Sequence, residues 1–139
     1  MPLKAYKNMN AYKLFVLDVG LLGAMSELPA ESILEGNDIF VEFKGALTEQ
    51  YVLQQLISDT PYTPYYYRNE KATFEQDFLI QKAKSIVPIE VKAEQNIRSH
   101  SLKTYCEKFQ PEEAVRFSTL KYKEQERMVN IPLYAVCNL

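Results

Sequence analysis

The stretch that decides the fold is FEQDFLIQKAKSIVPIEVKA, residues 74–93. It contains two runs of alternating residues, 74–80 and 86–93, joined by a connection short enough for an antiparallel hairpin. Successive side chains of a strand point to opposite faces, so positions 87, 89, 91 and 93 of the second run form a wholly apolar face. The sequence therefore predicts a β-hairpin with at least one buried face.

Charged residues interrupt both strands of this hairpin. Alternation places Gln76 on the face of positions 78 and 80, and it places Glu75 and Asp77 on the other face. A register that pairs positions 80 and 87 sets Asp77 opposite Glu90 and Glu75 opposite Lys92. Like charges directly opposed destabilise a sheet, so this pairing predicts either a cation between two carboxylates or a raised pKa on one. The alternative is a hairpin with one solvated face and an ordinary Glu75–Lys92 ion pair.

The composition predicts one folded domain without an overall charge that attracts nucleic acid. Hydrophobic residues make up 47% and charged residues 24% of the chain, as in ordinary globular domains, and the formal charge is −2. Any phosphate-binding surface must therefore be a local patch. A single histidine excludes a multi-histidine metal site. The two cysteines lack the spacing of metal ligands. Lacking a glycine-rich phosphate loop, a signal peptide and a long apolar run, the chain is expected to be cytoplasmic, outside membranes and unable to hydrolyse nucleotides alone.

Residues 1–38 are interpreted as a lead-in segment to the core. Within it, residues 12–25 begin as a β-rich apolar run, and Asp18 and Gly20 indicate a turn into a short helical segment. Residues 29–38 have the composition of a loop and end in a turn signal. The lead-in is therefore expected to hold one strand-like run and one short helix.

The core, residues 39–139, is predicted to begin with a helix over residues 40–58 that ends before Pro61. Glu49 lies at helical spacing from its apolar residues, which places the carboxylate within the packing stripe; these are Ala46, Val52, Leu53 and Leu56. An unpaired buried carboxylate is costly, so Glu49 is expected to have a partner. A helix rotated so that Glu49 lies at the stripe edge is the alternative.

The remaining elements complete a mixed sheet flanked by helices. A tyrosine-rich strand is predicted over 62–68, an amphipathic helix over 99–109 and a short strand over 114–118. A terminal strand is predicted over 131–136, where Pro132 favours an edge position. With the hairpin, the order is α, β, β, β, α, β with one further strand.

This order, with its charged residues, resembles the PD-(D/E)xK nuclease-like, or restriction-endonuclease-like, αβββαβ fold. The matching residues are Glu49 on the long helix, Asp77 on the second strand, and Glu90 and Lys92 on the third. The resemblance implies that the three acids bind Mg²⁺ or Mn²⁺, and that the lysine orients or activates the attacking water. Hard oxygen ligands suit such a cation, which polarises phosphate and lowers the pKa of bound water.

A more specific resemblance spans nearly the whole chain. Six ordered blocks are similar to those of the DUF4143 domain: 13–22, 45–52, 66–68, 75–78, 88–92 and 131–134. This domain forms the C-terminal part of many bacterial and archaeal AAA-type ATPases, and its fold is similar to that of the nucleases. Gln76 departs from the family, which usually has an aliphatic residue there. The resemblance implies that the chain is the C-terminal piece of a longer protein whose ATPase module, its expected partner, is missing here.

Two functions are compatible with this resemblance. The first is a divalent-metal-dependent phosphodiesterase acting on DNA or RNA, with Glu75 as an added acid. Arg68, on the neighbouring strand, would then contact phosphate or pair with an acid of the site. The second is a noncatalytic interaction or regulatory module that docks against the ATPase module, another protein or nucleic acid.

The two functions differ in what they require of the charged residues. In the noncatalytic module the acids and Lys92 form a closed ion network, with Glu75 neutralised by Lys92 and no metal bound. In the enzyme, Lys92 must be free to point at metal-bound water. Four tyrosines of the predicted strand over 62–68 offer either a stacking surface for single-stranded nucleic acid or ordinary sheet packing; they are Tyr62, Tyr65, Tyr66 and Tyr67.

Overall fold

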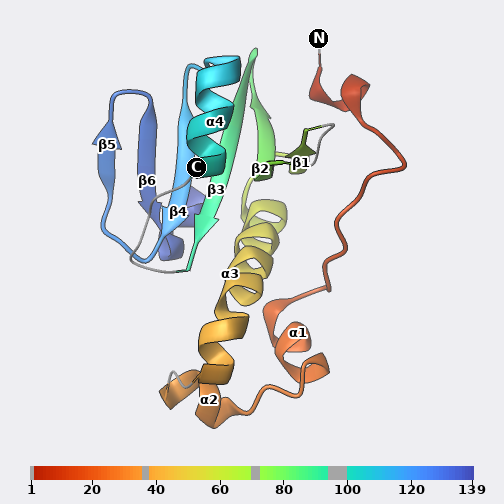
Figure 1. The fold of residues 1–139 in the computed structure, drawn as a ribbon, viewed down its shortest axis with the longest axis vertical. Coiled ribbons are helices and arrows are strands. Elements are labelled where there is room, and N and C mark those ends of the chain that lie inside the picture. Colours follow the sequence, from red (N-terminus) through yellow and green to blue (C-terminus); the bar gives the residue numbers. More distant parts are fainter. Residues whose placement is uncertain (1, 36–37, 70–72, 94–99) are drawn as a thin grey trace.

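The computed structural model describes residues 2–35, 38–69, 73–93 and 100–139. Its centre is a mixed six-stranded sheet in the order β1-β2-β3-β4-β6-β5 (Figure 1). The helices and strands are η1 (Leu3–Tyr6), α1 (Val19–Met25), α2 (Ala30–Glu35), α3 (Asp38–Asp59), β1 (Tyr65–Arg68), β2 (Glu75–Lys82), β3 (Ser85–Lys92), α4 (His100–Phe109), β4 (Ala114–Ser118), β5 (Lys123–Gln125), β6 (Met128–Pro132) and η2 (Leu133–Asn138). Among the described residues, no helix is both long and apolar enough to cross a membrane.

The hairpin of β2 and β3 has the predicted register. Ile80 pairs with Val87 and Phe78 with Ile89 in an antiparallel ladder. The turn is tight, because Lys82 pairs with Ser85, and Ala83 adopts a φ of 54°. The strand β3 also pairs in parallel with β4, which makes the sheet mixed as expected.

Helices α3 and α4 cover opposite faces of this sheet. On the α3 face, Val52 and Leu56 pack in the cluster that contains Phe78 and Ile80. On the other face, Leu79 packs with Tyr105 of α4. Adjacent strand residues point to opposite faces, so β2 contributes to both layers of the core.

An extra residue in β2 changes which side chains share a face. Tyr65 pairs with Leu79 and Tyr67 with Gln76, so a two-residue step on β1 lies opposite a three-residue step on β2. Such a bulge shifts the alternation by one position. Gln76 therefore lies on the α4 face with Tyr67 and Leu79, and the predicted shared face with Phe78 is wrong.

The lead-in segment contains no strand between η1 and α1, so the predicted β-rich run is wrong. The chain is extended there and runs beside α3 (Figure 1). Its backbone pairs with the amide side chain of Gln50: Val16 N donates to Oε1 at 3.1 Å, and Nε2 donates to Val16 O at 3.0 Å. The helix α1 then begins as predicted, with Asp18 as N-cap accepting from Leu21 N at 2.8 Å.

Gln50 is 2% exposed, so it is expected to be the main anchor of this segment. Replacing it by alanine (Gln50→Ala) should cost about 2 kcal/mol, since two hydrogen bonds are lost and a cavity forms. Denaturant unfolding measures that loss, and hydrogen exchange at the Val16 amide should accelerate. Gln55→Ala, at a half-buried position on the same helix, is the control. Equal losses in the two variants would contradict the anchoring role.

Three further sequence predictions need correction. The expected loop over 29–38 contains helix α2, and the strand over 62–68 is shortened to β1. The last strand, β6, lies earlier than predicted, and the chain continues as η2. The predicted edge position is wrong, because β6 lies inside the sheet between β4 and the short edge strand β5. Proline is tolerated there because Pro132 is the last residue of β6, where the ladder needs no further backbone donor. The predicted helices over 40–58 and 99–109 correspond to α3 and α4.

Candidate charged site at the β2–β3 strand pair

Three carboxylates and Lys13 gather where α3 meets the start of β2. Lys13 Nζ donates to Glu49 Oε1 at 2.7 Å and lies 3.5 Å from Glu75 Oε1. Burial opposes the lysine charge, but Glu49 and, more weakly, Asp77 and Glu75 outweigh it and raise the pKa of Lys13. The predicted partner of Glu49 is therefore Lys13, a residue that the sequence did not single out.

Glu49 lies at the edge of the buried stripe of α3 rather than within it. Its side chain is 25% exposed, whereas the adjacent Gln50 is buried. The rotated helix, weighed as an alternative from the sequence, is the arrangement found. The carboxylate can then reach the lead-in segment without entering the apolar core.

Asp77 is the most perturbed acid of the site. Burial and the neighbouring Glu90 carboxylate raise its pKa from 3.8 to about 7, against the opposing effect of a hydrogen bond from Val91 N to Oδ2 at 2.8 Å. Glu49 adds to the upward shift, and Lys13 reduces it. Of the two options that the sequence left open for the Asp77 and Glu90 pair, a bound cation or a raised pKa, these surroundings favour the raised pKa.

Glu90 is buried and accepts hydrogen bonds at both oxygens. Lys92 Nζ lies 2.8 Å from Oε1, and Gln76 Nε2 donates to Oε2 at 3.0 Å. Gln76 Nε2 also donates to Ile89 O at 2.7 Å. The remaining amide oxygen of Gln76 is buried without a hydrogen-bond partner among the described atoms. Gln76 thus makes a direct contact with Glu90.

A polar row continues from Glu90 across the α4 face of the sheet. Glu90 pairs in register with Arg116 on β4, which pairs with Asn130 on β6. Arg116 Nε donates to Asn130 Oδ1 at 3.0 Å, and Ser118 Oγ donates to the same oxygen at 2.7 Å. Burial lowers the pKa of Arg116, and Glu90 partly offsets that effect. Sequence reasoning missed this row, although an arginine and a serine within a five-residue buried strand were its signal.

Lys92 and Glu75 do not form the ion pair expected for the solvated hairpin and for the noncatalytic module. Lys92 contacts Glu90, and Glu75 contacts Lys13. Arg68 is directly across from Glu75 in the β1–β2 ladder, yet it is exposed and makes no ion pair with another described residue. Of its two predicted roles, contact with phosphate remains open and pairing with an acid of the site is not formed.

The acids suit a hard cation by type but not by arrangement. Carboxylate oxygens are the ligands that Mg²⁺ prefers. Within the described parts of the chain, however, no three acid, histidine or cysteine side chains come together as a ligand set. Glu49, Asp77 and Glu90 each have a nitrogen donor of the protein within hydrogen-bond distance. In this conformation the residues do not fit a bound Mg²⁺.

These features define an α/β domain in which helices on both faces of a mixed sheet enclose a network of charged side chains. The chain belongs to the family described as "Domain of unknown function (DUF4143)", whose model matches residues 44–136. The match spans Glu49, Asp77, Glu90 and Lys92 but not Lys13. No curated protein and no solved structure matches the chain. The family expected from the sequence is thus confirmed.

Proposed function

We propose that this domain is a noncatalytic interaction module that retains the acids of a nuclease-like site as a closed ion network. The observation that carries the proposal is the position of Lys13, whose ammonium group contacts both Glu49 and Glu75. It supplies, from within the chain, positive charge that a divalent cation would otherwise supply. Lys92 is likewise held by Glu90, at 2.8 Å.

Electrostatics supports this assignment. A metal that used Glu49 and Asp77 would have to displace the Lys13 ammonium and take Asp77 in its ionised form. A metal that used Glu90 would have to compete with Lys92 and Gln76. Each competition lowers the net affinity for the cation, because the charge-assisted hydrogen bonds lost are among the stronger ones in proteins.

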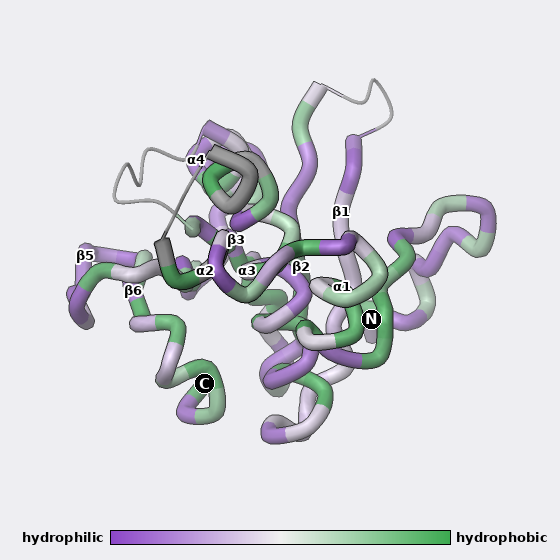
Figure 2. Tube along the Cα trace, turned by 90° about the horizontal axis from the view of Figure 1, so that it is seen from below, coloured by the Kyte–Doolittle hydropathy of each residue, from purple (hydrophilic) through white to green (hydrophobic). Residues whose placement is uncertain are grey.

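The exposed apolar residues of the lead-in segment and the first helices support docking of a partner. They include Leu14, Leu17 and Leu34, at 86%, 85% and 86% exposed, and Met25 at 67%. Figure 2 shows hydrophobic residues along this part of the chain, which lies outside the family match. Exposed apolar side chains in such number are a feature of surfaces that bind a partner. We propose that the ATPase module implied by the family resemblance covers these residues.

A metal-dependent phosphodiesterase is the second candidate, and the state of Asp77 favours it. A carboxyl whose pKa is raised to about 7 by burial and by Glu90 lies in a negative potential that a cation would relieve. In that case Asp77, Glu90 and Glu49 would hold Mg²⁺ or Mn²⁺, and Lys92 would act on the attacking water. This function requires a rearrangement that releases Lys13 from Glu49.

Calorimetric titration with Mg²⁺ and Mn²⁺ separates the two candidates. We expect no saturable binding up to about 10 mM, well beyond the weak end of protein sites for hard cations. The double variant Asp77→Ala with Glu90→Ala should give the same result. Asp59→Ala with Glu107→Ala, which removes two exposed acids elsewhere, is the matched control.

Saturable binding by the wild-type chain would overturn the proposal if it were lost in the first double variant and kept in the second. Cleavage assays on single-stranded, duplex and branched substrates would then follow. Metal-dependent cleavage that disappears in Lys92→Ala would establish the second candidate.

A further inference from the structure

A groove lies between the lead-in segment and the edge strand β1. Its volume is about 480 Å³, and its walls come from residues 3–15 on one side and 64–68 on the other, with a few core side chains at its base. The sheet order leaves β1 without a neighbour on this side. Figure 1 shows the lead-in segment running along this edge of the molecule.

Among the described residues that line the groove, three are basic and none is acidic. Lys7, Lys13 and Arg68 are among its lining residues. Lys13 is committed to Glu49 and Glu75, whereas Lys7 and Arg68 are exposed. Because Glu49 and Glu75 offset the charge of Lys13, the positive charge that the groove offers comes from Lys7 and Arg68. That surface complements an anionic ligand.

Tyrosine rings supply the second property of the groove. Tyr6 and Tyr12, on the lead-in wall, are 66% and 71% exposed. On the opposite wall the Tyr66 ring lies 5.8 Å from Lys13 Nζ. Tyr67 instead packs against Tyr105 and is part of the sheet core. Tyr65 and Tyr67 also line the groove, but both pack against the sheet core. The candidate stacking rings are therefore Tyr66 and the lead-in tyrosines.

We propose that this groove binds single-stranded nucleic acid, an inference that rests on the interaction role proposed above and names one of its partners. Lys7 and Arg68 would contact phosphates, and Tyr12 and Tyr66 would stack on bases. Alternating cations and aromatic rings are the general means by which proteins hold single strands without reading sequence. An extended peptide paired with the free edge of β1 is the competing occupant.

Fluorescence anisotropy with a labelled oligothymidine of about twelve nucleotides, within the site sizes known for single strands, tests the proposal. The measurement is made in EDTA, so it is independent of any metal. Tyr12→Ala is expected to weaken binding about tenfold, as for loss of one stacked base. Arg68→Glu should weaken it at least as much and reduce the slope of log K against log salt by about 0.7, the value for one phosphate contact on a single strand.

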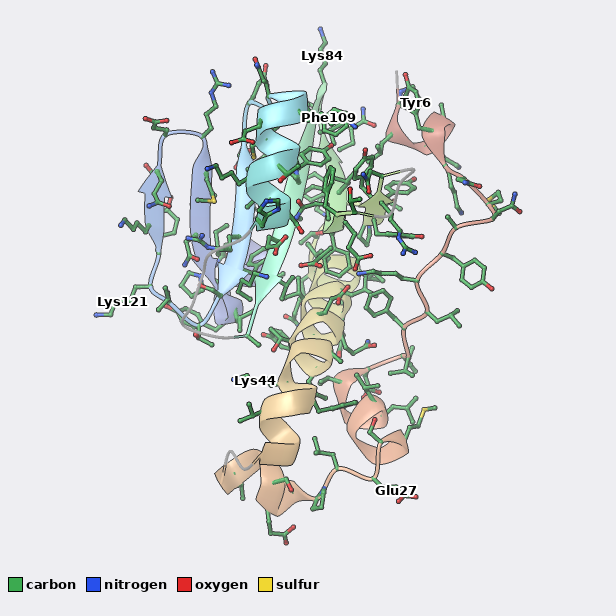
Figure 3. All side chains as sticks on the ribbon, in the orientation of Figure 1. Tyr6, Glu27, Lys44, Lys84, Phe109 and Lys121 are labelled. Atoms are coloured by element: carbon green, nitrogen blue, oxygen red, sulfur yellow. The ribbon has the colours of Figure 1, made fainter. Side chains whose placement is uncertain are left out.

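Matched controls are available outside the groove. Arg127→Glu changes an exposed arginine at the turn between β5 and β6, and Tyr134→Ala removes a tyrosine that is 82% exposed. Figure 3 shows Lys121, at the start of that hairpin, on the other side of the molecule from Tyr6. Both controls should bind within about twofold of the wild-type chain, because they lie outside the groove.

Three results would overturn the proposal. One is no binding by the wild-type chain at about 0.1 mM, the weak end of nonspecific association. Another is equal weakening by the groove variants and the controls. The third is that oligoglutamate displaces the labelled strand as effectively as unlabelled oligothymidine does. That result would mean that the groove binds anionic peptides. None of these depends on cation binding, so failure here is distinct from failure of the proposed function.

Discussion

Replacing Asp77 by asparagine is expected to stabilise the fold at neutral pH. At pH 8 the free energy of unfolding of Asp77→Asn should exceed that of the wild-type chain by about 2–4 kcal/mol, the scale set by a shift of about three pKa units. Asparagine keeps an oxygen that can accept from Val91 N, so the hydrogen bond at 2.8 Å is retained. What the substitution removes is the cost of a partly buried charge beside Glu90.

The sign of the pH dependence follows from the raised pKa. Burial, first, and Glu90, second, raise the pKa of Asp77 from 3.8 to about 7 in the folded chain. Below pH 3.8 the carboxyl is protonated in both the folded and unfolded states, so it has no effect on stability. As the pH rises toward 7, the unfolded chain ionises first and stability is lost. The advantage of Asp77→Asn should therefore be absent near pH 4 and complete above pH 7.

Chemical denaturation at a series of pH values from 4 to 8 measures this dependence. Asp59→Asn, at an exposed position near the end of α3, is the control and should track the wild-type chain at every pH. An advantage of Asp77→Asn that does not change between pH 4 and pH 8 would mean that the carboxyl is not the titrating group. No advantage at pH 8 would mean that the charge of Asp77 is compensated in the folded state.

The hairpin could be predicted from the sequence because its information is local. Alternation over residues 86–93 fixes which side chains of β3 are buried, and a short connection fixes the register with β2. The same register brings Asp77 near Glu90, which is why a raised pKa could be expected before the structure. The long helix was predictable for a similar reason, since its apolar spacing and Pro61 both lie within one segment.

The partners of the acids could not be predicted because they depend on bulges and on chain segments far apart in the sequence. One extra residue in β2 moves Gln76 to the face of Glu90, and no residue type near it signals a bulge. Lys13 contacts Glu49 although the two residues are 36 positions apart in the sequence, and Lys13 lies in a segment without regular structure. The position of that segment is set by the hydrogen bonds of Gln50 to the Val16 backbone. Helical spacing identifies Gln50 only as a polar residue and does not predict this contact.

Glu90 is expected to be a structural ion that depends on Arg116, rather than a metal ligand. Arg116 lies in register with Glu90 on the α4 face, and both residues are 4% exposed. Removing the arginine by Arg116→Leu should cost about 3 kcal/mol, because it leaves a buried carboxylate with less compensating charge and Asn130 without one donor. Denaturant unfolding measures this loss.

Glu90→Gln in the Arg116→Leu background should restore part of the lost stability, with a coupling free energy of about 1–3 kcal/mol. The physical reason is that a neutral amide no longer needs the arginine, while its single oxygen can still accept a hydrogen bond from either Gln76 or Lys92. Lys82→Leu with Glu113→Gln, a partly exposed pair at 3.4 Å, is the control cycle and should couple by well under 1 kcal/mol. A coupling as small for Glu90 and Arg116 would mean that Glu90 does not depend on the polar row, and that its charge is available to a cation after all.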